Sequence, residues 1–168
     1  MIDELDQANS TLSDFLLLSK YKAVELHPHD LNLIIQTVFP ALQAEAERTD
    51  KFVTTELGHI PILLLDDKEI PQLIINLSRN GLESMKSGDN LRISTRLEGN
   101  EVVLSVQDTG HGIKPHLREK LGTPFLTTKD NGTGLGLAVC YSIAARHKAI
   151  LAFETGDQGT TFYLRFRV

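Results

Sequence analysis

A chain of 168 residues can fold as one domain around a single hydrophobic core, and its 41% hydrophobic and 23% charged residues are ordinary for a globular protein. A net charge of −5 and the lack of any lysine or arginine run argue against a nucleic-acid-binding protein, which usually presents a basic face. No apolar stretch approaches the roughly 20 residues of a membrane-spanning helix. The single cysteine, Cys140, excludes an internal disulfide, fits a reducing cytoplasm and is expected to be a buried, inert thiol.

The first half of the chain alternates predicted helices with short extended segments. In chain order we expect a helix over 2–20, an extended link over 24–28, a helix over 31–49, strands over 52–57 and 62–65, and a helix that begins at Asp66 or Asp67 and ends near Met85. Asp30 is the expected N-cap of the second helix, and Pro40 is expected to kink or interrupt it. The first helix begins on an apolar stripe without a capping residue, which indicates that the chain enters it partway.

The second half is expected to contain two hairpins, a long loop and one helix. In chain order these are strands over 91–97 and 102–107, a loop over 110–133, a helix over 134–147, and a C-terminal hairpin whose last strand buries Phe162, Leu164, Phe166 and Val168. The loop is rich in glycine and proline, and an irregular segment of that length in a compact domain is usually a functional lid. The order of elements predicts an α/β (α+β) two-layer sandwich, a mixed β-sheet with about three helices on one face and a lid.

Four polar residues share one face of the helix predicted over 67–85, because they follow one another in steps of four, four and three. They are Gln72, Asn76, Asn80 and Glu83. Asparagine is a middling helix former, so two of them one turn apart need a reason. One interpretation is a solvated polar face. The other is a site where amide oxygens help to hold Mg²⁺, which takes few protein ligands together with waters and phosphate oxygens.

Asp108 follows a predicted strand directly and is flanked by Gly110 and Gly112. An Asp-Thr-Gly turn is common at strand ends and needs no ligand to explain it. The alternative is a buried carboxylate that accepts a hydrogen bond from an adenine amino group, with the glycines allowing the backbone to approach the base.

A glycine-rich segment over 132–137 opens the next helix, where free backbone amides can bind phosphate. The segment lacks the Lys-Ser/Thr of a Walker loop, and its spacing misses the dinucleotide fingerprint. Lys129 lies just before it in the loop and could meet the γ-phosphate, unless it is a solvated loop lysine. Thr160 opens the last strand after a glycine-rich turn and could reach the adenine through its hydroxyl or a water.

Together these segments resemble the ATP-binding catalytic domain of two-component sensor histidine kinases, within the superfamily that includes gyrase B, Hsp90 and MutL. The N, G1, F, G2 and G3 boxes of that family are matched, in that order, by residues 72–85, 108–113, 123–129, 132–137 and 159–162. The Asn-Gly-Leu-Glu-Ser-Met form over 80–85 is similar to nitrogen-regulation and sporulation kinases.

The resemblance implies a site for ATP and Mg²⁺ and a role for each matching residue. It implies Asn80 as the metal ligand and Asn76, Asn80 and Lys129 as the catalytic group. The residues that it implies for nucleotide binding are Asn80, Glu83, Asp108, Gly110, Gly112, Ile113, Thr128, Lys129, Gly132, Thr133, Gly134, Leu135, Gly136, Leu137 and Thr160. Asp108 would read the adenine amino group.

The resemblance also implies a division of the chain and a set of partners. Residues 1–22 resemble only the end of the second helix of a dimerisation and phosphoacceptor hairpin, and residues 23–168 resemble the catalytic domain. The phosphoacceptor motif has no match in this sequence. The expected partners are therefore that hairpin and a response regulator, in a cytoplasmic module whose full-length protein could be a membrane-anchored homodimer. Gly81 stands where the family usually has alanine, which costs a helix interior up to about 1 kcal/mol.

The expected reaction is transfer of the γ-phosphoryl group to an imidazole, and the isolated chain is expected to bind ATP without phosphorylating itself. Two alternatives stay open. One is a serine kinase of the anti-sigma type, which needs a base, and Glu69 and Glu83 are its candidates. The other is an ATP-gated clamp of the gyrase or MutL type, which usually has a glutamate base at the position that Asn76 occupies here.

Overall fold

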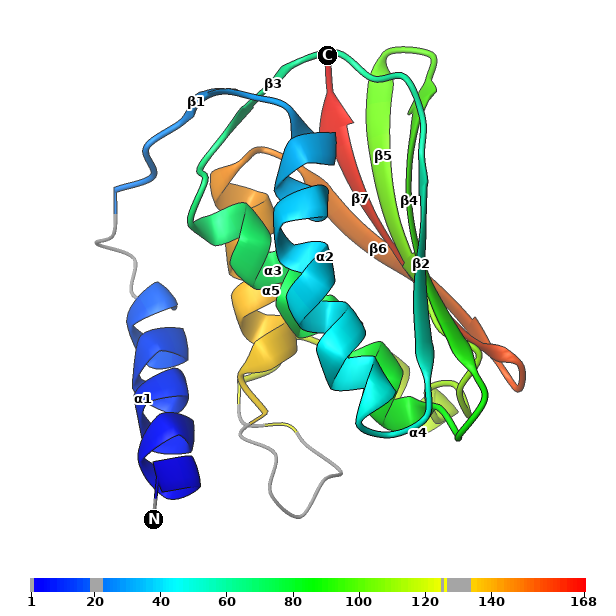
Figure 1. The fold of residues 1–168 in the computed structure, drawn as a ribbon. Coiled ribbons are helices and arrows are strands. Elements are labelled where there is room, and N and C mark those ends of the chain that lie inside the picture. Colours follow the sequence, from blue (N-terminus) through cyan, green and yellow to red (C-terminus); the bar gives the residue numbers. More distant parts are fainter. Residues whose placement is uncertain (1, 19–22, 125, 127–133) are drawn as a thin grey trace.

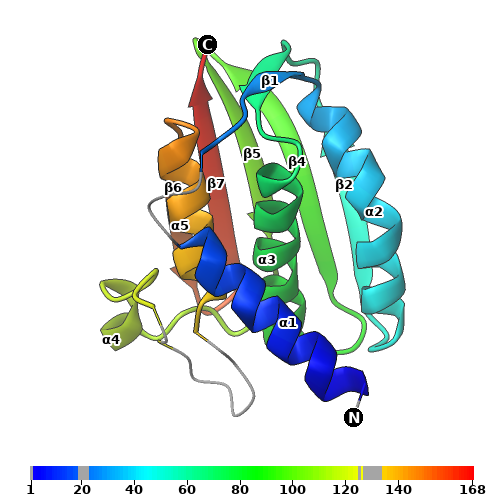
Figure 2. The same ribbon diagram turned by 90° about the vertical axis from the view of Figure 1, so that its left-hand side faces the viewer.

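The computed structural model describes residues 2–18, 23–124, 126 and 134–168, which form two layers (Figure 1). The elements are α1 (Ile2–Leu17), β1 (His27–His29), α2 (Leu31–Glu47), β2 (Phe52–Leu57), β3 (Leu63–Leu65), α3 (Glu69–Ser84), β4 (Asn90–Glu98), β5 (Glu101–Gln107), α4 (Pro115–Arg118), α5 (Gly136–Arg146), β6 (Ile150–Gly156) and β7 (Gly159–Arg167). Helices α2, α3 and α5 cover one face of a mixed five-stranded sheet (Figures 1 and 2). The predicted two-layer α/β sandwich is confirmed.

The sheet has the strand order β2-β4-β5-β7-β6. Strand β2 runs parallel to β4, and the other neighbouring pairs are antiparallel. Strand β3 was predicted correctly, but it pairs with β1 in a separate two-stranded sheet. From the sequence, the segment that includes β1 was expected to be an extended link. Strand β1 has only three residues, and its partner lies far along the chain, since Pro28 pairs with Leu64, 36 residues later. Such a strand leaves no local periodic signal.

The core lies between the sheet and the three helices. Its largest fully buried side chains are Leu31, Ile35, Leu42, Leu65, Ile70, Leu73, Ile74, Leu77, Leu91, Ile93, Leu104 and Leu135. Cys140 belongs to this core, and burial raises the pKa of its thiol far above the usual range, as expected of an inert cysteine. The expectation for the last strand fails at Val168, which is 50% exposed because β7 ends at Arg167, one residue before it.

Local side-chain bonds define the starts of two helices. Asp30 caps α2 as predicted, and its carboxylate accepts from the Asn32 amide at 2.9 Å. Helix α2 continues through the exposed Pro40 to Glu47, so the proline does not end it. Helix α3 begins after Lys68, later than expected, but Asp66 still stabilises its start, because its carboxylate accepts from the amides of Lys68 at 2.9 Å and Glu69 at 3.0 Å.

The long loop after β5 contains one short helix that the sequence did not predict. Helix α4 has Pro115 as its first residue, and proline suits that position because it has no amide hydrogen to leave unpaired. Part of the loop, residue 125 and residues 127–133, lies outside the described residues.

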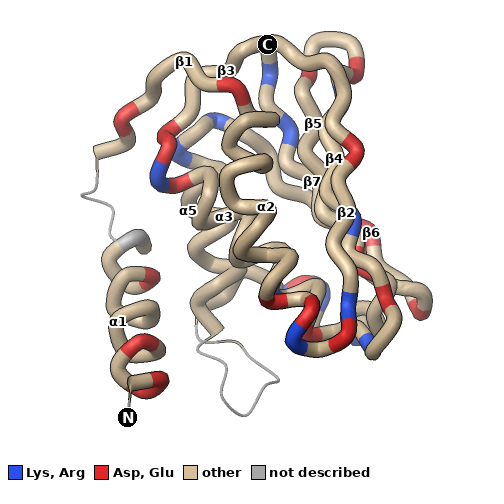
Figure 3. The backbone as a smooth tube through the Cα atoms, in the orientation of Figure 1, with Lys and Arg blue, Asp and Glu red and all other residues tan. Residues whose placement is uncertain are grey.

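Helix α1 lies outside the helical layer, beside α5 (Figure 2). The side chain that it buries is a charged one, not an apolar one. Its only buried side chain among those described is Asp14, at 8% exposure. Its apolar residues are 57–76% exposed; they are Ile2, Leu5, Leu12, Phe15 and Leu16. The helix carries acidic residues and no lysine or arginine (Figure 3). None of the described helices is long and apolar enough to cross a lipid bilayer.

A buried ion pair fastens the start of α3 to the end of α5. The Arg146 guanidinium donates to both carboxylate oxygens of Glu69 at 3.1 Å, and the Glu69 side chain has no solvent exposure. His147, also buried, accepts from the Asp66 amide through Nε2 at 3.0 Å. Its proton must therefore lie on Nδ1, which donates to the Ile143 carbonyl at 2.8 Å.

Replacing Glu69 with glutamine should strongly destabilise the domain. Breaking a buried pair by removing one partner leaves the other charge uncompensated and costs about 3 kcal/mol or more. We expect urea denaturation of E69Q to show a loss of that size in the free energy of unfolding. The control is E45Q, which breaks the more exposed pair between Arg79 and Glu45 and should cost about 1 kcal/mol at most. Equal losses in the two variants would contradict this account.

Candidate functional site

Asp108 lies at the end of β5, with its carboxylate held by the backbone of two other segments. Its side chain is on the helix side of the sheet, and the residue is 7% exposed. One carboxylate oxygen, Oδ1, accepts from the amides of Gly110 at 2.9 Å and Thr160 at 3.1 Å. Burial raises the pKa of this carboxyl, and the two amides and the Ser84 hydroxyl oppose that rise without cancelling it. Buried carboxyl groups whose pKa is shifted by desolvation are typical of functional sites.

Thr160 belongs to the same small cluster. Its carbonyl accepts from the Asp108 amide at 2.9 Å, so that β5 and β7 continue their pairing by one residue. Its hydroxyl lies 2.8 Å from the hydroxyl of Thr155, on β6 directly opposite. The Thr155 hydroxyl in turn accepts from the Ile113 amide at 2.8 Å, which ties the loop after Asp108 to the sheet.

The glycines around Asp108 are required by protein packing. A Cβ atom on Gly110 would lie 2.1 Å from the Ser84 Oγ, and one on Gly112 would lie 2.0 Å from the Gly156 carbonyl oxygen. Gly112 also has a positive φ of 74°, which favours glycine. The role expected of these glycines from the sequence, the approach of a base, stays a prediction. In the structure both positions are in close contact, Gly110 with α3 and Gly112 with the β6–β7 turn.

Helix α3 passes directly over Asp108 and reaches the site through Gly81. A Cβ atom on Gly81 would lie 2.6 Å from Leu91 Cδ1 and 3.2 Å from Asp108 Cβ. The glycine therefore lets α3 approach both β4 and the carboxylate, and this close packing offsets the cost of glycine in a helix.

The polar face of α3 is joined to the start of α5 through Asn76. The Asn76 side chain is buried, accepts from Gln72 Nε2 at 2.8 Å and donates to the Gly136 carbonyl at 3.3 Å. Asn80, one turn further along, is half-buried, and Glu83 is exposed near the end of the helix. Among the described residues there is no group of three or more His, Cys, Asp or Glu side chains that could hold a metal. A cation here would need oxygen ligands from another source, such as phosphates and water.

Helix α5 begins without a side-chain cap from any described residue. The amides of its first turn have no partners within the helix, so they can bind an anion. Gly134 has a φ of 70°, which explains a glycine there, and Leu135 is fully buried. Where a Cβ on Gly136 would lie, no described atom is within 4 Å, so packing of the described residues does not require this glycine. Leu137 is half-buried and packs against the core.

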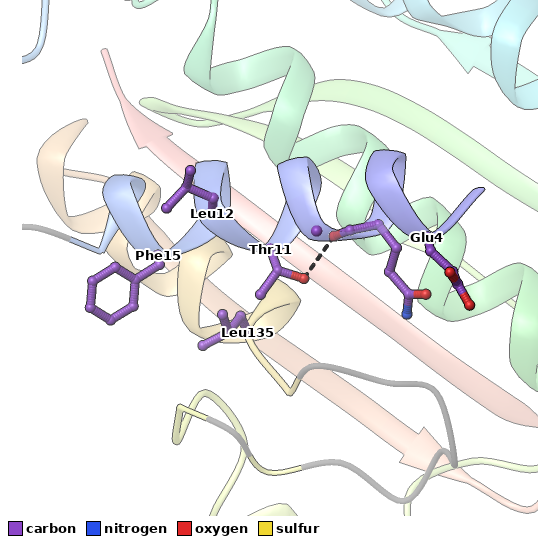
Figure 4. Close-up of a pocket in the computed structure, with 7 residues that line it drawn as sticks. Glu4, Thr11, Leu12, Phe15 and Leu135 are labelled. Atoms are coloured by element: carbon purple, nitrogen blue, oxygen red, sulfur yellow. Dashed lines mark hydrogen bonds between the residues drawn. The ribbon is translucent and has the colours of Figure 1, made fainter. Parts of the chain in front are cut away.

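A groove of about 560 Å³ separates the start of α5 from α1 (Figure 4). Leu135, the residue just before α5, lines the groove and points toward Thr11 and Phe15 of α1. The other lining residues are Glu4, Gln7, Ala8 and Leu12. The groove lies beside the first turn of α5.

The structure brings several of the sequence-predicted site residues into contact. The Thr160 amide donates to Asp108, and the Asn76 side chain donates to Gly136. Asn80 lies one turn after Asn76 on α3. Four predicted residues lie outside the described residues: Thr128, Lys129, Gly132 and Thr133. The sequence analysis missed Thr155 and Ser84. Thr155 could have been found, since a hairpin that turns over 156–159 pairs it with Thr160.

Comparisons with known proteins agree with this arrangement. A family model described as "Histidine kinase-, DNA gyrase B-, and HSP90-like ATPase" matches residues 65–168. Sporulation kinase C of Bacillus subtilis (strain 168) is 31% identical over 165 residues, which cover 96% of this chain and 39% of that protein. Sensor histidine kinase ZraS of Escherichia coli (strain K12) is 30% identical over 166 residues, which cover 98% of this chain and 36% of that protein. The chain thus spans well under half the length of these relatives.

A solved structure supports the same assignment. The crystal structure of histidine kinase ThkA in complex with response regulator protein TrrA matches with a TM-score of 0.79 and 25% identity, over 99% of this chain and 48% of the matched chain. The resemblance inferred from the sequence motifs is therefore confirmed. The family match covers more than half of the chain, and the chain belongs to the histidine kinase-, DNA gyrase B- and HSP90-like ATPase family, as an ATP-binding domain of the kind found in sensor histidine kinases.

Proposed function

We propose that this chain binds Mg-ATP and donates the γ-phosphoryl group to a histidine on a dimerisation hairpin, whose phosphoacceptor segment is not in this sequence. The observation that carries the proposal is the convergence of three motifs along one side of α3. Gly81 packs against Asp108, and Asn76 binds the carbonyl of Gly136 at the start of α5. These contacts support a single site made of a base reader, a polar helix face and an uncapped helix start.

Asp108 is proposed to read the base. Two backbone amides hold Oδ1 of its carboxylate, and such an acceptor suits the amino group of adenine and repels the carbonyl oxygen that guanine has there. Thr160, bound to the same oxygen through its amide, is proposed as the second contact to the base, with Gly110, Gly112 and Ile113 forming the wall of the pocket.

The start of α5 is proposed to bind the phosphates, through the backbone amides near Gly134, Leu135, Gly136 and Leu137. Asn80 is proposed as the protein ligand of Mg²⁺, with Glu83 nearby. An amide oxygen fits this role, because Mg²⁺ takes few protein ligands and completes its shell with phosphate oxygens and waters. Bound Mg²⁺ would neutralise phosphate charge. Thr128, Lys129, Gly132 and Thr133 are assigned to phosphate binding from their place in the sequence alone.

Phosphoryl transfer requires mainly that the reactants are aligned and that the phosphate charge is neutralised. The protein needs to form no covalent bond with the substrate. A neutral imidazole already offers a lone pair, so the acceptor needs no base from this chain. Asn76 is a poor base, and its amide is engaged with Gln72 and Gly136, which suits a positioning role. These properties favour a histidine acceptor over hydrolysis.

The serine-kinase alternative is weakened by the position of its candidate bases. Glu69 is buried in its ion pair with Arg146 and lies 11 residues before Asn80, which is about 16 Å along a helix. That leaves Glu83, which is exposed at the other end of α3.

Residues 1–22 are proposed to be the end of the second helix of the hairpin, and residues 23–168 the catalytic domain. The exposed apolar side of α1 would then face the rest of the hairpin in a homodimer of the full-length protein. A response regulator is the proposed final acceptor, by analogy with the ThkA complex with TrrA. Because ATP is supplied in the cytoplasm, we assign the domain to that compartment.

Asp108→Asn should remove adenine binding while leaving the fold intact. A hydrogen bond to a charged group is worth about 1.5–3 kcal/mol, so ATP affinity should fall by about 10- to 100-fold in calorimetry. The asparagine carbonyl can still accept from both amides. Because the wild-type pKa is raised, ionised Asp108 costs stability as pH rises above the ordinary carboxyl range.

At neutral pH D108N should therefore be at least as stable as the wild type, and this advantage should vanish in acid as Asp108 becomes protonated. Asp67→Asn, at an exposed position just before α3, is the control and should bind ATP normally. Normal ATP affinity in D108N would contradict the assignment.

Asn80→Ala should weaken the contribution of Mg²⁺ to ATP binding. We expect the ratio of the dissociation constants without and with Mg²⁺ to fall by about tenfold, since the lost ligand is worth at least a charge-assisted hydrogen bond. Affinity without Mg²⁺ should change little. Arg79→Ala, the exposed neighbour on α3, serves as the control. An unchanged ratio in N80A would remove Asn80 from the metal site.

A phosphotransfer assay tests the function as a whole. The chain is incubated with γ-labelled ATP, alone and with a histidine-bearing dimerisation hairpin. We expect acid-labile label on the hairpin and none on the isolated chain. Acid-stable label on a serine substrate would instead support the serine kinase, and ATP-dependent dimerisation without transfer would support the clamp.

A further inference from the structure

We infer that Tyr141 of α5 is a positioning residue for the phosphates of the bound nucleotide, because its ring holds the loop after β5 against α5 at Gly122. The inference rests on the proposed function, since it needs phosphates at the start of α5. Tyr141 lies in none of the sequence motifs, and nothing in the proposed chemistry uses it.

The contact between Gly122 and Tyr141 leaves no room for a side chain on the loop. A Cβ atom on Gly122 would lie 2.4 Å from Cδ2 and 2.8 Å from Cε2 of the Tyr141 ring, so the loop backbone lies directly on the ring. Gly122 also has a φ of 81°, which favours glycine. Tyr141 is partly buried and packs against the hydrophobic core, as does the neighbouring Leu121 of the loop. The ring is therefore a firm support for the loop.

This support lies close to the place where the phosphates are proposed to bind. Tyr141 comes five residues after Gly136, the first residue of α5, which is about 7.5 Å along a helix. The chain leaves Tyr141 at Gly122 and returns to the start of the same helix at Gly134, with 11 residues between these two glycines. Both ends of that segment are thus fixed to α5.

Without the ring, the loop is still anchored at its beginning. The Ile113 amide donates to the Thr155 hydroxyl at 2.8 Å, and this bond does not involve α5. The segment between fixed points could then lengthen to the 20 residues between Ile113 and Gly134.

The length of a loop between fixed points determines how often its residues reach a ligand. Their effective concentration falls roughly as the 3/2 power of the length. The residues that the sequence assigns to the phosphates, 128–133, belong to this segment. Lengthening it should therefore weaken ATP binding by about two- to threefold. Adenosine has no phosphate, and the surroundings of Asp108 do not depend on the ring, so its affinity should not change.

A double-mutant cycle tests the inference. Tyr141→Ala removes the ring, and Gly122→Ala adds the Cβ atom that cannot fit beside it. We expect calorimetry to show that each variant binds ATP about two- to threefold more weakly than the wild type, and that the double variant binds no more weakly than Y141A. Adenosine affinity, measured by NMR titration, should be the same in all three. Tyr141→Phe keeps the ring and should bind ATP as the wild type does.

Gly88→Ala is the matched control for G122A. Gly88 has a φ of 89°, and no described atom lies within 4 Å of a Cβ placed there, so this variant carries the backbone strain without the clash. It should bind ATP normally. If Y141A fails to fold, G122A against G88A still gives the comparison of ATP with adenosine.

Two results would overturn the inference. They are additive losses of ATP affinity in the double variant, and an equal loss of adenosine affinity, which a general structural role of the ring would cause. Unchanged ATP affinity in Y141A and G122A would overturn it as well, and would leave the proposed function standing. A wild-type chain that bound no ATP would instead refute the proposed function.

Discussion

The burial of one carboxylate determines how this end of the domain is built. Asp108 is removed from water, and taking an ionised group out of water costs several kcal/mol unless partners replace the solvent. The amides of Gly110 and Thr160 supply that replacement, and each bond to a charged acceptor is worth about 1.5–3 kcal/mol. Both partners are backbone groups, so the loop and strand that carry them must come close.

That closeness explains the small residues around the carboxylate. Gly159 has a φ of 127°, and a Cβ atom on it would lie 2.1 Å from the Asp108 carbonyl oxygen. Gly110 and Gly81 are equally confined by Ser84 and Leu91. These glycines, which in the sequence suggest a ligand-binding loop, thus also allow the backbone to approach and hold the Asp108 carboxylate. The same carboxylate is thereby fixed before any ligand arrives, which reduces the entropy lost on binding.

Helix α3 connects the surroundings of Asp108 to the start of α5. It is fixed at its start by Asp66 and by the pair between Glu69 and Arg146, and in its middle by the bond from Asn76 to Gly136. Both of the last two contacts run to α5. These contacts hold α3 and the start of α5 in a fixed relative position. The proposed function requires this, because a metal, phosphates and a base must be aligned in one site.

Much of this could be predicted from the sequence, because the governing signals are local. Periodicity predicted α2 and α3, Asp30 predicted a cap, and the hairpin pattern over 91–107 predicted that Asp108 follows a strand. What failed depends on distant contacts. The pairing of β1 with β3 joins segments that carry no common pattern, and the exposure of Val168 depends on where the sheet ends. Thr155 acts only through two residues that the fold brings to it.

Under the proposed function α1 would have to separate from the domain during turnover, and the polarity of its contact fits that. Burial raises the pKa of Asp14, and the nearby Arg79 charge opposes that rise only in part. A contact made through a desolvated carboxylate contributes little net stability, because desolvation offsets most of the attraction. The large apolar residues of α1 that the structure describes stay more than half exposed, including Leu12 and Phe15, which line the groove beside Leu135. Under the proposed function, strong contacts therefore lie within the hairpin and weak ones between hairpin and domain, so the domain can bring its nucleotide to the histidine and withdraw without unfolding either part.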